Sequence, residues 1–291
     1  MPSLERLAAR QQVTLCVTQP DKPQGRGLKL EPSPVKVAAR RLGVPLRQLE
    51  RLDRAVVEES GVELGVAVAY GMLIPREVLA APRHGLLGVH PSLLPKYRGA
   101  APVAWAILNG ETMTGVTVFR LNERLDAGEI LVQETVRIEP EEDAQALAER
   151  LAHLGADALM RAVDMIDTGR VAFRPQDDTA AIMAPKLTKA QGRVEWAAPA
   201  ETLARLIRAL VPWPGATTEW HGQSVKLWAA SATAGPAAAP GTVVSVGPEA
   251  IVVATGQGLL AIRALQPAGR RRMAVQEFLA GHHVNVGDRF E

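Results

Sequence analysis

The stretch Leu86-Leu87-Gly88-Val89-His90-Pro91-Ser92-Leu93-Leu94-Pro95-Lys96-Tyr97-Arg98-Gly99 decides how the rest of the chain is interpreted. Its apolar start predicts a buried strand that ends at His90, because Pro91 cannot donate to a strand ladder and keeps the residue before it extended. In open parallel sheets, ligands bind at the carboxyl ends of the strands. We therefore expect the imidazole of His90 at the edge of the sheet where a site can form.

A second polar turn, Leu125-Asp126-Ala127-Gly128, lies between two strand-like runs at 114–121 and 129–139. A histidine and a carboxylate on neighbouring turns are the groups that acid–base chemistry needs. On spacing alone, an alternative stays open and is the more frequent outcome: His90 only ends a strand and Asp126 only makes a turn.

Length and composition describe an ordinary globular protein. The 291 residues can bury a large core and predict two domains, and 47% of them are hydrophobic and 22% charged. No apolar run approaches the ~18 residues that span a membrane, and the N-terminus is amphipathic rather than a signal peptide. The single cysteine, Cys16, lies in an apolar run and excludes a disulfide or a cysteine-based metal site within the chain. These features fit a reducing cytoplasm.

Charge is segregated along the chain although the net charge is only +2. Residues 22–54 hold nine Lys and Arg against three acidic residues, and residues 109–150 hold ten acidic residues against four arginines. Such segregation predicts a basic face suited to a polyanion. A solvated basic helix is the alternative.

The order of the predicted elements indicates two different domains. Helices at 35–42, 52–59 and 145–166 alternate with apolar strands such as 64–70, which predicts an α/β domain with a parallel sheet over 1–169. Residues 170–188 are predicted to be a linker. From residue 216 onward, short strands come every 8–12 residues between Gly and Pro turns, which predicts a small β-barrel over 189–291.

Two long motifs resemble the family of formyltransferases that use formyltetrahydrofolate: His90-Pro-Ser-Leu-Leu-Pro-Lys-Tyr-Arg-Gly-Ala-Ala-Pro102 and Leu125-Asp126-Ala-Gly128. Within the family, three further stretches resemble the branch that formylates the α-amino group of initiator methionyl-tRNA in translation initiation: Thr18-Gln-Pro-Asp-Lys-Pro-Gln-Gly-Arg-Gly27, Pro32-Ser-Pro-Val-Lys36 and Pro212-Trp-Pro214. The resemblance implies a Rossmann-like, parallel-sheet formyltransferase domain followed by an OB-like β-barrel that helps to hold the tRNA. It also implies 10-formyltetrahydrofolate as formyl donor, with no metal and no membrane. No coiled-coil pattern is present, so we expect a monomer.

The resemblance also implies roles for individual residues. His90 would steady the oxyanion and move protons, and Asp126 would orient His90 through a hydrogen bond or a water. The folate would lie against the turn and loop formed by Tyr70, Gly71, Leu73, Ser92, Leu93, Leu94 and Pro95. The tRNA would meet a projecting basic loop, a basic connection and the basic side of the barrel, formed by Arg26, Lys22, Lys29, Lys186, Lys189, Arg270, Arg271 and Arg272.

The chain departs from the family pattern at two places. The family has a catalytic Asn two residues before the histidine, and Gly88 stands there. Loss of one preorganised donor costs about 10²–10³ in rate. The N-terminal segment begins in a helix, so the first central strand is expected to be missing. Three alternatives therefore stay open: a formyltransferase for a small amine or amino sugar, a formyltetrahydrofolate hydrolase, and a catalytically impaired protein that binds tRNA or folate.

Overall fold

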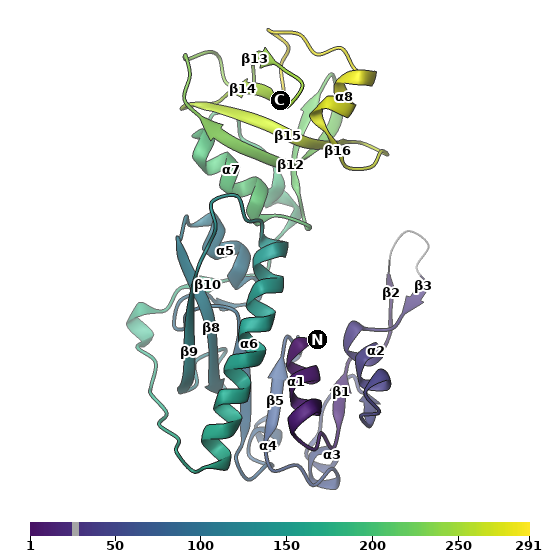
Figure 1. Ribbon diagram of the computed structural model, residues 1–291, viewed down its shortest axis with the longest axis vertical. Coiled ribbons are helices and arrows are strands. Elements are labelled where there is room, and N and C mark those ends of the chain that lie inside the picture. Colours follow the sequence, from purple (N-terminus) through teal and green to yellow (C-terminus); the bar gives the residue numbers. More distant parts are fainter. Residues whose placement is uncertain (25–28) are drawn as a thin grey trace. The chain divides into compact units, whose positions relative to one another are not determined.

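The computed structural model describes residues 1–24 and 29–291 and divides into two compact units (Figure 1). Unit 1 consists of Met1–Pro102, Met113–Arg137 and Ala148–Ala184, and unit 2 consists of Val103–Thr112, Ile138–Leu147 and Pro185–Glu291. The division after Ala184 leaves most of the predicted linker in unit 1. The boundaries 1–169, 170–188 and 189–291 stay a prediction.

The N-terminal part of unit 1 contains a small parallel sheet. Strand β1 (Cys16–Thr18) pairs in parallel with β4 (Leu46–Gln48). Ser33 caps the helix between them by accepting a hydrogen bond from the Lys36 backbone N–H. The other elements of this part are α1 (Pro2–Arg10), the hairpin strands β2 (Lys22–Gln24) and β3 (Lys29–Glu31), α2 (Pro34–Arg41), α3 (Arg54–Glu59) and α4 (Arg76–Leu79).

A second sheet of unit 1 has the strand order β5-β6-β8-β9. Strands β5 (Gly65–Val68) and β6 (Leu86–His90) are parallel, as the alternation of strands and helices predicts. Strands β8 (Met113–Arg120) and β9 (Ile130–Arg137) are antiparallel to their neighbours, a departure from the purely parallel sheet that the sequence suggests. For the β8–β9 pair the cause is the short connection at 121–129, because a parallel pair needs a longer crossover.

The long amphipathic helix predicted at 145–166 is α6 (Ala144–Asp167). It packs closely on the second sheet at Gly155, where an added Cβ would lie 3.0 Å from Val89 and 3.7 Å from Val116. Leu151, Leu159 and Ala162 are buried on the same helix, at the three- and four-residue spacing of one helix face. The helix α5 (Pro102–Leu108) precedes β8.

A cavity of about 900 Å³ separates the two sheets of unit 1. Residues of β1 and β5 line it along their length, together with Leu7 of α1 and Ile166 of α6. In the described part of the chain, β1 and β5 each pair with one neighbouring strand only. Strand β5 is consequently only partly buried, with Val68 40% exposed, although its apolar sequence predicts a strand buried on both faces.

After α6, residues 174–184 return across unit 1, and we call this segment the strap. It contains the short helix η1 (Asp178–Ala180) and strand β10 (Met183–Ala184), which pairs in parallel with β7 (Arg98–Gly99). At its start, Arg174 exchanges two backbone hydrogen bonds with Ile130 at the beginning of β9. The strap therefore contacts two separate parts of unit 1.

Unit 2 carries an antiparallel sheet in the order β11-β12-β15-β14-β13, with β16 beside β15. Residues 288–291 hydrogen-bond Glu219 on one edge and Gly241 and Val243 on the other, so the sheet closes on itself. This closure is the barrel that the regular spacing of strands predicts. The elements are η2 (Lys189–Gly192), α7 (Ala200–Ala209), β11 (Ala216–Trp220), β12 (Gln223–Thr233), β13 (Val243–Val246), β14 (Ile251–Ala254), β15 (Leu259–Pro267), β16 (Met273–Ala274) and α8 (Val275–Gly281).

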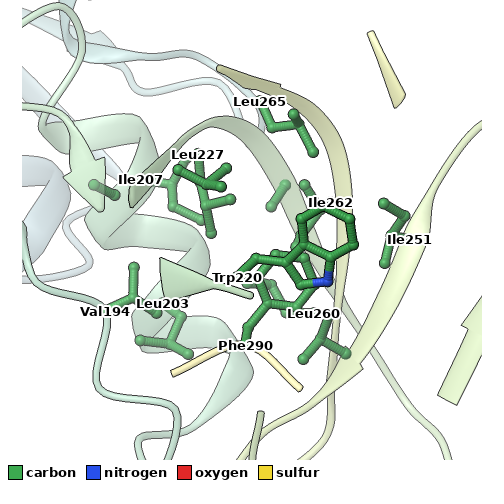
Figure 2. Packing of buried hydrophobic residues seen from close by; sticks show 14 of the residues in the cluster. Val194, Leu203, Ile207, Trp220, Leu227, Ile251, Leu260, Ile262, Leu265 and Phe290 are labelled. Carbon is green, nitrogen blue, oxygen red and sulfur yellow. The ribbon is translucent and has the colours of Figure 1, made fainter. Parts of the chain in front are cut away.

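The barrel interior is one apolar core, which Figure 2 shows from close by. Trp220 and Phe290 stack with ring centroids 6.4 Å apart. Leu203 and Ile207 reach the core from one face of α7, and Leu260 and Ile262 reach it from alternate positions of β15. Burial of these side chains holds the barrel together. None of the helices in the described residues is long and apolar enough to cross a membrane.

Candidate active site

His90 lies at the carboxyl end of β6, as predicted, and is 7% exposed. Its ring nitrogen Nε2 lies 2.8 Å from the carbonyl oxygen of Tyr97. Because a carbonyl only accepts hydrogen bonds, Nε2 carries a proton and donates it there. The other ring nitrogen, Nδ1, faces Asp126 Oδ2 at 3.7 Å.

The Asp126 turn lies beside His90 and has a constrained backbone. Asp126 has φ +48°, in the left-handed region that disfavours residues with a Cβ. Its Oδ2 accepts a hydrogen bond of 2.8 Å from the Gly99 backbone N–H. At Gly128 a Cβ would lie 1.7 Å from the Arg120 carbonyl oxygen, so only glycine fits. The structure thus places Asp126 beside His90, as predicted from the sequence.

Gly88 lies opposite Phe119 in the pairing of β6 and β8. Positions 88 and 90 are two apart on one strand, so they share a face of the sheet. A Cβ at 88 would lie 2.6 Å from Phe119 Cε1 and 2.9 Å from Leu121 Cδ2. The aromatic ring, which is 2% exposed, therefore fills the space that a side chain at 88 would need.

The loop after His90 is fixed by hydrogen bonds to its own backbone and to β8. The Ser92 hydroxyl donates to the Lys96 carbonyl, and Leu94 N–H donates to Thr117 Oγ1. Ser92 and Leu94 are buried, whereas Leu93 and Pro95 are partly exposed. The loop is therefore rigid in two of the four residues predicted to contact folate, and its other two side chains reach the surface.

The turn after β5 combines an exposed leucine with a buried phenol. Leu73 is 86% exposed. The Tyr70 hydroxyl is buried and finds no hydrogen-bond partner among the described residues, and burial raises the pKa of Tyr70. Gly71 has φ +70° and lets the chain reverse between them. Tyr70 lines the cavity between the two sheets of unit 1, whereas Leu73 does not.

The predicted tRNA residues are distributed over both units. Arg26 lies outside the described residues, as does the side chain of Lys29. Lys22 donates to Gln19 Oε1 in unit 1. The remaining predicted residues are exposed in unit 2, where Arg271 pairs with Glu277 and Arg272 lies over the Trp228 ring; they are Lys186, Lys189, Arg270, Arg271 and Arg272.

Sequence reasoning missed two residues that shape the site, Phe119 and Gln176. Gln176 Nε2 donates to the carbonyl oxygens of Asp126 and Gly128. Phe119 carries no signal beyond that of an apolar residue in a strand, and Gln176 lies in a segment that reads as a linker. Among residues 1–24 and 29–291, no group of three or more His, Cys, Asp or Glu is placed to hold a metal.

The chain matches two family models. One, described as "Formyl transferase", covers residues 3–163, and one described as "Formyl transferase, C-terminal domain" covers residues 186–283. A protein of Geobacter metallireducens named methionyl-tRNA formyltransferase is 41% identical over 99% of this chain and 94% of its own length. A protein of the same name from Trichlorobacter lovleyi is 43% identical over 98% and 92%.

Solved structures with the same fold are more distant in sequence. The sugar 3N-formyltransferase WlaRD has a TM-score of 0.68 at 15% identity, over 93% of this chain and 94% of its own. HypX from Aquifex aeolicus in complex with tetrahydrofolic acid has a TM-score of 0.62 at 22% identity, over 86% of this chain and 47% of its own. At these identities the likeness concerns the fold.

Proposed function

The chain belongs to the formyl transferase family, and on this premise we propose that it transfers a formyl group from 10-formyltetrahydrofolate to the α-amino group of initiator methionyl-tRNA. The observation that carries the proposal is the arrangement of His90, whose Nε2 is fixed on Tyr97 while Nδ1 faces the Asp126 carboxylate. We propose that a monomer carries out this reaction in the cytoplasm, where methionyl-tRNA is made.

The residues of the site fit the folate. Leu73 offers an apolar surface, the Tyr70 hydroxyl offers a buried polar group without a partner, and Leu93 and Pro95 reach the surface of the loop after His90. When bound, the folate supplies the activated formyl group. The protein's own task is to hold it against the loop and to exclude water from the reaction.

His90 and Asp126 would manage the protons. The attacking amine must lose a proton and the leaving nitrogen must gain one. Nδ1 is the ring nitrogen that can take up and release this proton, because Nε2 is occupied by the Tyr97 carbonyl. Asp126 Oδ2 faces Nδ1, and the Gly99 N–H keeps that carboxylate in place. The Asp126 charge would compensate the imidazolium that forms transiently.

The basic residues would recruit the tRNA. Lys22 and Lys29 belong to the paired strands β2 and β3, Arg26 lies between them in the sequence, and an arginine fork suits phosphates or base edges. Phosphate contacts of this kind weaken with salt. The relatives that share 41–43% identity act on methionyl-tRNA by name, whereas the sugar formyltransferase shares 15%. This difference favours tRNA over an amino sugar as acceptor.

A single-turnover assay with radiolabelled initiator methionyl-tRNA and formyltetrahydrofolate tests the proposal. We expect label transfer by the wild-type chain and a loss of about 10²–10⁴ in rate for His90→Gln. His153→Gln, on the exposed surface of α6, is the matched control and should leave the rate unchanged. Formate release without tRNA would indicate a hydrolase. Salt-dependent tRNA binding without turnover would indicate an impaired relative.

A further inference from the structure

We propose that Gln176 is a positioning residue for formyl transfer: its carboxamide holds the Asp126 turn so that the carboxylate stays beside His90. The inference deepens the proposed function and rests on it. Gln176 lies 50 positions after Asp126, in the strap, and outside the stretches 3–163 and 186–283 that the family models match.

The Asp126 turn needs to be held from outside. Asp126 has φ +48°, a conformation that costs free energy at a residue with a Cβ, although Asp adopts it more readily than most residues, so contacts from outside the turn help to keep it there. The carboxylate itself makes one hydrogen bond of 2.8 Å, from the Gly99 N–H, and faces His90 at 3.7 Å. A small rotation of the turn would therefore change the distance between the Asp126 carboxylate and the His90 ring, and with it the compensation of the imidazolium charge.

Gln176 contacts the turn at both ends. Its Nε2 donates to the Asp126 carbonyl at 2.8 Å and to the Gly128 carbonyl at 2.7 Å. The two N–H groups of one carboxamide thus satisfy two carbonyls that flank the central residue of the turn. Such a pair of bonds fixes the orientation of the Asp126–Ala127 and Gly128–Glu129 peptide groups.

Arg98 fixes the orientation of the carboxamide. Its Nε and Nη2 both donate to Gln176 Oε1, at 3.1 and 2.7 Å. A guanidinium has donors only, so the amide oxygen must face Arg98 and the amide nitrogen must face the turn. The Arg98 side chain is 8% exposed and also binds Asp178 at 2.8 Å. Hydrogen bonds from Arg124 and Arg98 lower the pKa of Asp178, which keeps it ionised.

The dipeptide Arg98–Gly99 closes this set of contacts. Its side chain orients Gln176, its backbone holds the Asp126 carboxylate, and as β7 it pairs with β10 at the end of the strap. The carbonyl groups and the carboxylate of the turn are therefore fixed by segments that are bonded to each other. If Gln176 only filled space, its amide would not need to direct both N–H groups at the Asp126 turn.

Two substitutions separate the hydrogen bonds from other effects. Gln176→Glu keeps an acceptor for Arg98 but removes both donors to the turn, and Gln176→Leu removes them without adding charge. Gln223→Glu, at an exposed position of β12, is the matched control for the charge change. The assays are steady-state formylation of methionyl-tRNA and amide hydrogen exchange of the peptides that cover 95–101 and 122–130.

Both Gln176 variants should lower kcat by roughly 10- to 100-fold, the scale expected for a misplacement near 1 Å, with KM for tRNA unchanged. Exchange in 122–130 should accelerate, and Gln223→Glu should change neither quantity. In an Asp126→Asn background, Gln176→Leu should cause no further loss, because the carboxylate that it positions is gone. Equal losses in both backgrounds, or an effect of Gln176→Glu without one of Gln176→Leu, would overturn the proposal.

The outcome also separates this inference from the proposed function. A wild-type chain that transfers no formyl group overturns the proposed function. In that case faster exchange of 122–130 in Gln176→Leu still supports the holding contact, and unchanged exchange overturns it.

Discussion

Phe119 fills the position that a side chain at residue 88 would occupy, which allows a quantitative test of whether the missing amide at 88 limits the rate. A Cβ at this position would lie 2.6 Å from Phe119 Cε1, whereas carbon atoms pack at about 3.5–4.0 Å. Phe119 is 2% exposed and packs in a cluster with Leu94 and Ile130, so its ring cannot turn aside without displacing these neighbours. We predict that Gly88→Asn alone lowers the free energy of unfolding of unit 1 by about 1–3 kcal/mol, the cost of overpacking, and does not raise the rate.

Replacement of the Phe119 ring by a smaller side chain should allow Asn at position 88 to raise the rate. Phe119→Leu opens the space beside position 88 at a cost below the about 3–5 kcal/mol of a Phe→Ala change. In the double variant Gly88→Asn, Phe119→Leu, the new amide can point toward the reacting formyl oxygen. If the absence of an amide at position 88 limits catalysis in the wild type, the double variant should be faster than Phe119→Leu alone by a factor of up to about 10²–10³.

The assay combines rate with local stability. Single-turnover formylation of labelled methionyl-tRNA gives the rate of each variant. All five tryptophans lie in unit 2, so their fluorescence does not follow unit 1: Trp105, Trp196, Trp213, Trp220 and Trp228. Cys16, the single cysteine, is buried in β1 and burial raises the pKa of its thiol, so thiol labelling during denaturation reports the opening of unit 1.

Two results would refute this reasoning. A faster Gly88→Asn variant with unchanged Cys16 labelling would show that Phe119 does not block position 88. A double variant no faster than Phe119→Leu alone would show that the missing amide does not limit the rate. Phe119→Leu alone serves as the matched control, because it has the cavity without the amide.

Three further predictions concern the surroundings of the site. Leu73→Ala should raise KM for the folate several-fold while changing stability by less than about 0.5 kcal/mol, because Leu73 is 86% exposed; folate titration of the rate measures this. Hydrogen bonds from Lys36 and Gln48 hold the pKa of Asp21 below its ordinary 3.8, so their contribution to stability is present above pH 3.8 and lost as the pH falls through the lower folded pKa. Acid titration should therefore show the stability gap between wild type and Lys36→Met closing below that pH. Arg26→Ala should weaken tRNA binding and reduce the slope of log K against log salt by about 0.7–0.9, and an unchanged slope would remove the loop from the tRNA site.

The strands around His90 and Gly88 could be predicted well from local sequence. The apolar run that breaks at Pro91 becomes β6 with His90 at its end, and the run at 114–121 becomes β8 within one residue. These predictions hold because they depend on features of a few consecutive residues: an apolar run that is buried on both faces, and a proline that lacks the backbone donor needed to continue the strand. Strand β1 (Cys16–Thr18), by contrast, is short and pairs with one strand only among the described residues.

The supporting contacts of the site were beyond sequence reasoning. Nothing around Gln176 distinguishes it from a polar residue in a linker, because its role depends on a turn 50 positions earlier. The same holds for Phe119, whose ring is opposite Gly88 only after β6 and β8 have paired. Contacts of this kind follow from register and from the return path of the chain, which periodicity does not encode.

The closure of the barrel by residues 288–291 has a consequence for biosynthesis. These residues hydrogen-bond both edges of the sheet of unit 2, so that sheet cannot close while they are still inside the ribosome. Most of unit 1 emerges much earlier and can fold while synthesis continues. Until residues 288–291 emerge, β11 and β13 remain open edges on the nascent chain, and their unpaired N–H and C=O groups can pair with another chain.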